Sequence, residues 1–210
     1  MAFGVARLKV RWPMAEICSV YDDNDGDIYI YRIDRSDQIM SLSDNWLSFA
    51  IENDGIERNA PDKVIGQSLW DYITGDETQH LYQIVLKKVR SRKQSIRLLF
   101  RCDSPDICRY LQLSVIPLEE DAIEFRSQIL RTEPRETVEL LKNNVKRSDK
   151  VIKICSTCKK IAVSETEWEE TEAAINTLKV FEHEKAPQLT HGLCKYCYDI
   201  AMSEINSMDI

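Results

Sequence analysis

The sequence has no long uncharged apolar run and no excess of positive charge. A membrane-spanning helix needs about 18 or more consecutive apolar residues, and no segment of the 210 residues approaches that length. The N-terminal residues also lack the apolar run of a secretory signal peptide. With 28 Lys and Arg residues against 35 Asp and Glu residues, the net charge is -7, which disfavours DNA and RNA as partners. We therefore expect a cytoplasmic protein that contacts neither membrane nor nucleic acid.

Common catalytic motifs are missing as well. The chain has only 3 His residues and contains no GxSxG, phosphate-binding loop or HExxH motif. It also has few helix and strand breakers, with 6 Gly and 6 Pro, while 43% of its residues are hydrophobic. This composition is typical of a folded globular protein. The sequence thus predicts a globular protein that is not an enzyme.

Residues 28–131 have the pattern of an α+β unit, preceded by an N-terminal lead-in at 1–27. Two short β-rich runs come first, at 28–33 and 38–42. Helices are expected after Ser43 or Asp44 as far as about 53–55, and at 75–91, with a loop at 59–62 between them. Three alternating segments follow at 95–102, 108–118 and 122–130. The last three predict an antiparallel meander with one covered face.

Two motifs in this unit carry a family resemblance. They are Asn45-Trp46-x-x-Phe49-Ala50 and Gly66-x-Ser68-Leu69-Trp70-Asp71-Tyr72-Ile73. Together with the order of strands and helices, they resemble a PAS domain, the small sensory fold of bacterial signalling proteins. The resemblance implies a five-stranded antiparallel sheet with helices on one face and, in many members, a pocket for a ligand whose identity the sequence does not give.

Four residues are candidates for lining such a pocket: Trp46, Phe49, Trp70 and His80. The aromatic residues can equally be plain core residues of an α+β unit. His80 lies near the position where haem-binding members of the family place an iron ligand. A single His on a partly polar helix is more typical of a surface residue, so haem is disfavoured as a cofactor.

Residues 132–150 are expected to link two parts of the chain. Pro134 should end the last strand because proline cannot donate to a sheet ladder. Residues 136–147 then have the spacing of an amphipathic helix, with Val138, Leu141 and Val145 on one side. Such a helix is either a linker packed on the preceding unit or a homodimer contact, and the sequence does not separate the two.

Cysteine is the residue type that points to a site. Seven Cys residues in a chain without a secretion signal favour metal or redox chemistry over a disulfide framework. Four of them form two CxxC pairs, Cys155/Cys158 and Cys194/Cys197, separated by 35 residues. Four thiolates complete the tetrahedral shell of Zn²⁺, so the sequence predicts a structural zinc site.

Residues 151–210 are expected to fold around this metal. His191, three residues before Cys194, is either a hydrogen-bond donor behind the ligands or one ligand of a Cys3His site. Ser164-Glu165-Thr166-Glu167 matches a capping box that would open a helix carrying Trp168, Ile175 and Leu178 on one side. A unit of this size has too few apolar residues to fold unaided, so zinc should contribute much of its stability.

The cysteine-rich part also resembles a known unit. The pattern Ile154-Cys155-x-x-Cys158-Lys159-Lys160-Ile161, then Trp168, then His191-Gly192-Leu193-Cys194-x-x-Cys197-Tyr198 is similar to a zinc-binding module found after PAS, GAF or receiver domains in bacterial signalling proteins. Ala162 and Lys195 depart from the usual pattern, and neither is a proposed ligand. The resemblance implies an architecture and a signalling setting more than an activity.

These features predict a non-enzymatic cytosolic sensory protein. In this interpretation the PAS-like domain senses a ligand or partner, and the structural zinc module mediates interaction with another signalling protein. Two alternatives stay open: a thiol-based redox sensor acting through the zinc-bound CxxC pairs, and a constitutive adaptor that has no ligand. The sequence shows no kinase, cyclase or DNA-binding segment, so any output would pass through another chain.

Overall fold

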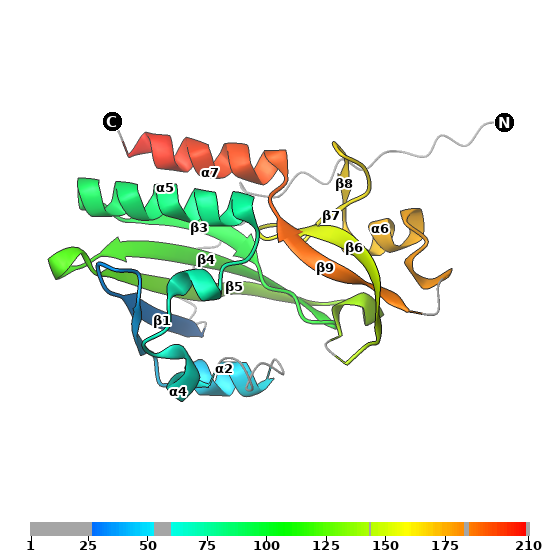
Figure 1. Cartoon of the computed structure of the whole chain (residues 1–210), viewed down its shortest axis with the longest axis horizontal. Helices are drawn as coiled ribbons and strands as arrows, with labels where there is room; N and C mark the ends of the chain where they lie inside the picture. Colours follow the sequence, from blue (N-terminus) through cyan, green and yellow to red (C-terminus); the bar gives the residue numbers. More distant parts are fainter. Residues whose placement is uncertain (1–26, 53–59, 143, 183–184, 209–210) are drawn as a thin grey trace.

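The described residues form two β-sheets and five α-helices, arranged as an α+β fold (Figure 1). The computed structural model describes residues 27–52, 60–142, 144–182 and 185–208. The predicted lead-in at 1–27 therefore lies outside the described residues, except for its last residue. Among the described residues, no helix combines the length and the apolarity needed to cross a membrane.

The first sheet has five strands, all paired antiparallel in the order β2-β1-β5-β4-β3. Its strands are β1 (Ile28–Ile33), β2 (Ile39–Leu42), β3 (Ile96–Arg101), β4 (Ile107–Pro117) and β5 (Ile123–Pro134). The predicted five-stranded antiparallel sheet is thus confirmed. The strand β5 continues to Pro134, which pairs with Ile107 at the end of the ladder. Proline is tolerated there because the chain leaves the sheet at that residue.

Three short helical segments and one long helix lie in the described residues between β2 and β3. They are α2 (Trp46–Glu52), α4 (Pro61–Val64), the 3-10 turn η1 (Leu69–Asp71) and α5 (Asp76–Arg92). The loop predicted at 59–62 is wrong in part, because α4 begins at Pro61. Proline suits the first helical position, where its fixed φ is already helical and its missing N–H has no partner to lose.

The helix α5 packs against one face of the sheet. Leu81, Val85 and Val89 are buried on it, at the 3.6-residue spacing expected from the sequence. They share a core with Val115 and Phe125 of the sheet. At the basic C-terminal end of α5, Arg90 forms a 2.7 Å ion pair with Asp37. The helix is therefore tied to the β1–β2 turn at one end.

The helix predicted at 136–147 is wrong. The described residues of this segment contain only a 3-10 turn, η3 (Glu139–Leu141), before β6 begins at Arg147. Val138 and Leu140 are both buried, and this alternation replaces the helical spacing that the sequence suggested. Backbone hydrogen bonds hold the segment to the β3–β4 loop, where the amide of Val138 donates to the oxygen of Pro105. The possible homodimer contact through residues 136–147 stays a prediction.

The second sheet contains four strands in the order β8-β7-β6-β9. They are β6 (Arg147–Cys155), β7 (Ile161–Ala162), β8 (Trp168–Glu169) and β9 (Ala186–Gly192). The strands β6 and β9 are parallel, and the other pairs are antiparallel. Behind them lie α6 (Thr171–Thr177) and the 3-10 turn η4 (Val180–Glu182), which help to enclose a second core with Leu140 and Ile161.

The helix predicted to open at Ser164 is also wrong. Ser164 Oγ does accept a 3.1 Å hydrogen bond from the amide of Glu167, as a capping box requires. The chain then turns back, because the amide of Val163 donates to the oxygen of Glu167 and closes the β7–β8 hairpin. Trp168 therefore lies on a strand, and the helix α6 begins at Thr171 instead.

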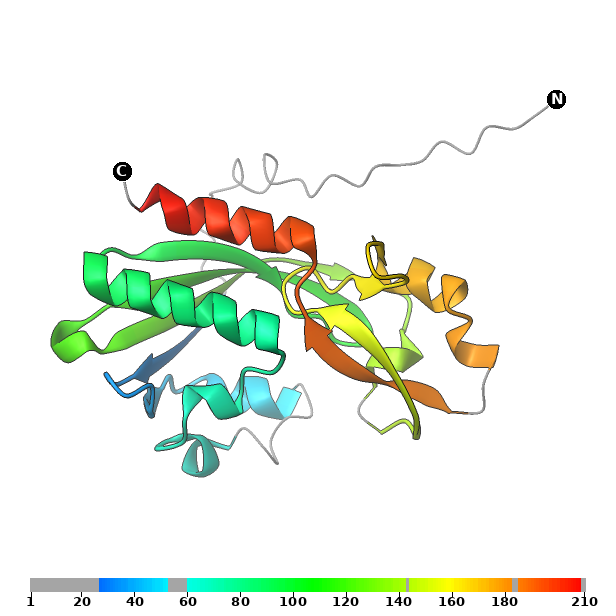
Figure 2. The ribbon, with the colours of Figure 1, turned by 45° about the horizontal axis from the view of Figure 1, so that its top comes forward.

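The last helix, α7 (Lys195–Ser207), returns to the first sheet and lies beside α5, as Figures 1 and 2 show. Ala201 and Ile205 of α7 are buried in the same core as Leu81 and Ile96. Residues from both ends of the described chain thus share one apolar core. The two units predicted at 28–131 and 151–210 are joined by this helix.

A buried group of charged residues also joins the two sheets. The Arg101 guanidinium pairs with Asp103 at 2.5 Å and with Glu170 at 2.8 Å. Arg135 pairs with the same Asp103 at 2.9 Å and with Glu172 at 2.5 Å. Arg101 ends β3 and Arg135 directly follows β5, and the two glutamates flank the start of α6. Buried charges require such partners because desolvation is costly.

Candidate metal centre

Two parallel strands bring the CxxC pairs to the same edge of the second sheet. The strand β6 ends at Cys155, and β9 ends at Gly192, which is the register partner of Cys155. Cys194 follows two residues later. Because parallel strands run in one direction, their final residues meet at one edge. The register between β6 and β9 therefore brings the two CxxC pairs next to each other.

The first CxxC pair lies in a tight turn after β6. The amide of Cys155 donates to the oxygen of Lys160 at 2.7 Å, and the amide of Lys159 donates to the oxygen of Cys155 at 3.1 Å. Lys159 has a positive φ of 60°, the left-handed conformation that a sharp reversal requires. The amide of Ser156 donates to the oxygen of Gly192 at 2.8 Å. This last bond fixes the turn to the end of β9.

The second CxxC pair begins α7. Cys194 is the N-cap residue, and Cys197 lies in the first turn of the helix. The positive end of the helix dipole favours negative charge at these positions, and helix N-termini lower the pKa of cysteine thiols for the same reason. The sequence thus places two cysteines at a helix end that favours negative charge. The pKa of the Cys194 thiol is lowered, whereas the hydrogen bonds that Cys197 shares with the other three cysteines raise its pKa.

The four sulfur atoms converge. All of them lie within 4.8 Å of one another, and the Sγ atoms of Cys158 and Cys194 are 3.8 Å apart. In a tetrahedral zinc site with Zn–S bonds of about 2.3 Å, neighbouring sulfurs are about 3.8 Å apart. The amide of Cys194 donates to Cys155 Sγ at 3.4 Å, the type of contact that stabilises a ligating sulfur. The residues therefore fit a structural zinc ion.

The cluster is shielded from solvent. The exposed fractions of the four cysteines lie between 0% and 6%, and Trp168 and Leu193 pack against them. Hydrogen bonds from Cys158, Cys194 and Cys197 lower the pKa of Cys155. The hydrogen bond between Cys158 and Cys155 raises the pKa of Cys158.

His191 lies beside the cluster but outside it. In the part of the chain that the structure describes, the group able to hold a metal consists of the four cysteines alone. The Nδ1 atom of His191 is 3.2 Å from Thr74 Oγ1, and the side chain is exposed. The backbone of His191 lies against Gly75, at the start of α5. His191 therefore connects β9 to the first unit.

The predicted pocket residues do not come together. Trp46 packs edge-on against Tyr31, with ring centroids 6.0 Å apart. Trp70 donates from Nε1 to Asp37 at 3.0 Å and borders a polar groove. His80 lines a different surface pocket, next to Trp168. The side chain of Phe49 lies outside the described part. Sequence order alone could not show that these residues point to separate places.

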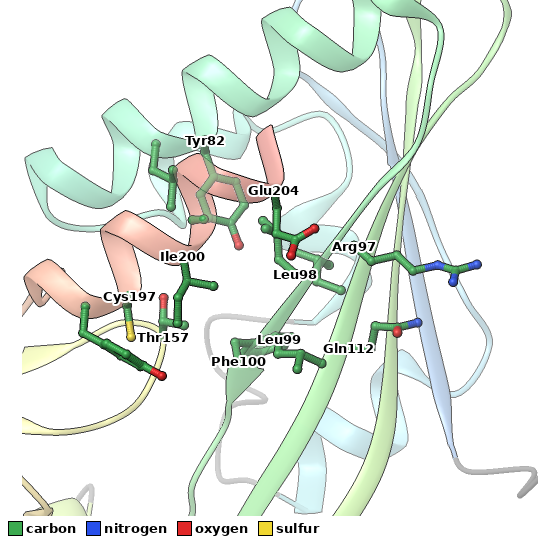
Figure 3. A pocket seen from close by; sticks show the side chains of 14 residues that line it. Tyr82, Arg97, Leu98, Leu99, Phe100, Gln112, Thr157, Cys197, Ile200 and Glu204 are labelled. Carbon is green, nitrogen blue, oxygen red and sulfur yellow. The ribbon is translucent and has the colours of Figure 1, made fainter. Parts of the chain in front are cut away.

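A cavity of about 200 Å³ lies instead between β3, α5 and α7, and Figure 3 shows the residues that line it. Cys197, a member of the sulfur cluster, borders one end of this cavity. Sequence reasoning missed it because one wall comes from α7, a helix that the sequence analysis did not anticipate. The alternation of Leu98 and Phe100 in β3 was the available signal for the opposite wall.

Comparisons with known proteins give little further information. No protein-family model matches the sequence, and no curated protein matches it either. A solved structure, a domain of an HTR-like protein from Haloarcula marismortui ATCC 43049, aligns with 50% of this chain and with 98% of its own length. The sequence identity is 17% and the TM-score is 0.35. Similarity at this level assigns neither a family nor a function to the chain.

Proposed function

We propose that this protein is a non-enzymatic cytoplasmic signalling protein in which a zinc ion holds a PAS-like sensory unit and a cysteine-rich module together. The sensory unit responds to a ligand or partner, and the combined surface contacts another signalling protein. Zinc has a structural role in this proposal, because four thiolates fill its tetrahedral shell and leave no open position for a substrate.

One observation carries the proposal: the helix that begins at the sulfur cluster ends in the core of the first sheet. Cys194 and Cys197 stand at the start of α7, and Ile205 near its other end is fully buried. Figure 2 shows α7 extending along α5 from the second sheet. Metal binding at one end of α7 is therefore coupled to the packing of the sensory sheet at the other end.

Several features support the PAS-like assignment of the first unit. It has five antiparallel strands, and α5 covers one face. The motif that begins at Gly66 also has a clear structural role. Ser68 caps η1 by accepting from the amide of Trp70, and it forms a bridge with Gln38 next to β2. The motif thus connects the first hairpin to the helical layer.

The contacts between the units suggest how a change in the sheet would reach the metal. The hydroxyls of Thr78 and Ser156 are 2.9 Å apart, and Lys153 forms a 3.2 Å ion pair with Glu77. Both contacts join the first turns of α5 to the end of β6. The proposed path runs through α5 and α7, and it does not need the linker helix that the sequence predicted.

Burial of the sulfur atoms favours structural zinc over redox sensing. An oxidant must reach a sulfur to react with it, and reactive cysteines are solvent-accessible. The cluster residues are almost completely buried. Oxidation would require the cluster to open first, so a rapid thiol switch is not the function that this geometry supports best.

Metal analysis and native mass spectrometry of the purified full chain test the proposal. We expect one zinc ion per chain, and loss of that ion in the Cys155→Ser and Cys194→Ser variants. Cys102→Ser is the matched control, because Cys102 lies outside the cluster and should leave zinc content unchanged. The proposal is wrong if the wild-type protein carries no stoichiometric metal, or if a strong chelator leaves its unfolding transition unchanged.

The same native mass spectra address the sensory part. A retained small molecule, or a change in the unfolding temperature with candidate effectors, supports a sensor. A chain that carries zinc but shows neither would instead be the constitutive adaptor. The two parts of the proposal can therefore fail independently.

A further inference from the structure

The cavity between β3, α5 and α7 has mainly apolar walls. Leu98 and Phe100 of β3 form one side, Leu81 comes from α5, and Ile200 and Ala201 come from α7. In Figure 3 the side chain of Ile200 extends from α7 toward β3. Leu81 and Ala201 are buried, so the walls are held in place by the core behind them. Ligand sites typically combine such apolar walls with a few fixed polar groups.

Tyr82 supplies a polar group inside this space. Figure 3 shows its hydroxyl directed between Ile200 and Glu204. Among the described residues, the hydroxyl has no hydrogen-bond partner, although the ring itself stacks on Phe125. Burial raises the pKa of Tyr82 to about 12, so the hydroxyl is a neutral donor near pH 7. Tyr82 is half-buried and lines the cavity, so its free hydroxyl is available to donate a hydrogen bond to a bound molecule.

The charged groups at the cavity do not select for a charged ligand. Arg97 and Glu204 both line it, and both side chains are exposed. Figure 3 shows the Arg97 side chain pointing away from the space that Tyr82 faces. The two opposite charges therefore remain in solvent while the interior is neutral. An ion placed inside would lose its hydration without gaining a partner.

The volume limits the size of the ligand. An apolar cavity of about 150 Å³ holds one benzene molecule, and this cavity is about 200 Å³. We propose that it binds a small neutral molecule, about the size of a single substituted ring, with an apolar body and one hydroxyl or carbonyl group that accepts a hydrogen bond from Tyr82.

This site depends on the metal of the proposed function, because α7 forms one wall and begins at the sulfur cluster. Cys197 itself borders the cavity, four residues before Ala201. Without the metal, the start of α7 loses its anchor and the wall is no longer fixed. Ligand affinity should therefore fall when zinc is removed, and by linkage the ligand should tighten zinc binding.

The test uses two probes of equal shape, 4-methylphenol and toluene, titrated into the zinc-loaded full chain and followed by NMR. Tyr82→Phe should weaken 4-methylphenol binding about 3- to 10-fold, the effect of losing one neutral hydrogen bond, and should leave toluene binding unchanged. Tyr31→Phe is the matched control, since Tyr31 also stacks on Phe125 but does not line the cavity. It should change neither probe.

A second variant tests the place of binding. Ala201→Leu adds volume inside the cavity and should abolish binding of both probes. If Ala201→Leu does not fold, Ala201→Val is the milder variant, and it should weaken binding of both probes.

The proposal is overturned if neither probe binds the zinc-loaded chain at millimolar concentration, or if Tyr82→Phe weakens both probes equally. Binding that persists unchanged after chelation would overturn the coupling to zinc but not the site. Absence of zinc in the purified protein, with Tyr82-dependent binding retained, would instead refute the metal proposal alone.

Discussion

The backbone amide of Arg101 donates a 2.7 Å hydrogen bond to the carbonyl oxygen of Thr157, inside the first CxxC turn. Arg101 is the last residue of β3, which is an edge strand of the first sheet. Unpaired edge groups are available for unwanted pairing with other chains. The first CxxC turn therefore covers part of this edge, and the sulfur cluster is fixed directly to the first sheet.

Asp103 should be critical for stability. Its side chain is almost completely buried and accepts hydrogen bonds from both Arg101 and Arg135. Asp103→Asn removes the shared negative charge, and breaking a buried ion pair from one side costs about 3–5 kcal/mol. Urea unfolding would measure this loss. Asp106→Asn, at an exposed position in the same loop, should cost less than about 0.5 kcal/mol. Equal effects in the two variants would contradict the structural role of the buried group.

Ile205 tests the docking of α7. The residue is fully buried against the first sheet, so Ile205→Ala should lower the free energy of unfolding of the zinc-loaded protein by about 2–5 kcal/mol. The same substitution should have a smaller effect after chelation, since α7 is then less well held. Ser203→Ala, at an exposed position of the helix, serves as the control. An effect of Ile205→Ala that is the same with and without zinc would show that α7 docks independently of the metal.

A comparison of alanine substitutions at two glycines measures the cost of disturbing the contact between the start of α5 and β9. Gly75 and Gly66 have similar φ values, 90° and 85°, so alanine is strained at both, by about 1–2 kcal/mol. A Cβ atom at Gly75 would lie 2.5 Å from the oxygen of His191, whereas one at Gly66 would meet no atom within 4 Å. Thermal unfolding should therefore show a clearly larger loss for Gly75→Ala. Similar losses would mean that the contact with His191 adjusts without cost.

Glu124 should make stability depend on pH. Burial alone would raise its pKa, but hydrogen bonds from Arg32 and Arg126 hold that pKa below its usual value. The unfolded chain binds more protons near the ordinary pKa, so this contribution is present at neutral pH and is lost as the pH falls through the lowered value. Glu124→Gln should be less stable by about 1–3 kcal/mol at pH 7.

Urea unfolding of wild type and Glu124→Gln across pH 3–7 checks this expectation. The difference between the two proteins should shrink toward acid pH, and any release of metal by acid cancels in the comparison. Glu119→Gln, at an exposed position near the same strand, provides the control. A difference that stays constant with pH would assign the loss to packing and not to the carboxylate.

Local signals in the sequence were sufficient for the first sheet and for the cysteine pairs. The five strands and α5 follow alternation or a 3.6-residue repeat over their own lengths. Each CxxC spacing is a local signal as well, although the meeting of the two pairs depends on the pairing of β6 with β9. The strands, α5 and the two cysteine pairs were predicted because each pattern lies within one short segment of the sequence.

Features that depend on distant residues were missed. Residues 136–147 have a helical repeat, but Leu140 fills the second core and Arg147 donates to the oxygen of Leu140 at 2.9 Å. These tertiary contacts override a weak helical preference. The strand β9 has few β-branched residues and forms because it pairs with β6. The candidate cavity was missed for the same reason, since its walls come from β3, α5 and α7.

The position of α7 also has a consequence for synthesis of the chain. The apolar face over Ile96 and Leu98 is completed by Ile205 and Met202, which are synthesised well after the strands of the first sheet. While the ribosome is still translating the cysteine-rich part, that face is without its final cover. A nascent chain at this stage would expose an apolar surface, and the proposed zinc ion would shorten that exposure by fixing the start of α7 as soon as Cys197 is made.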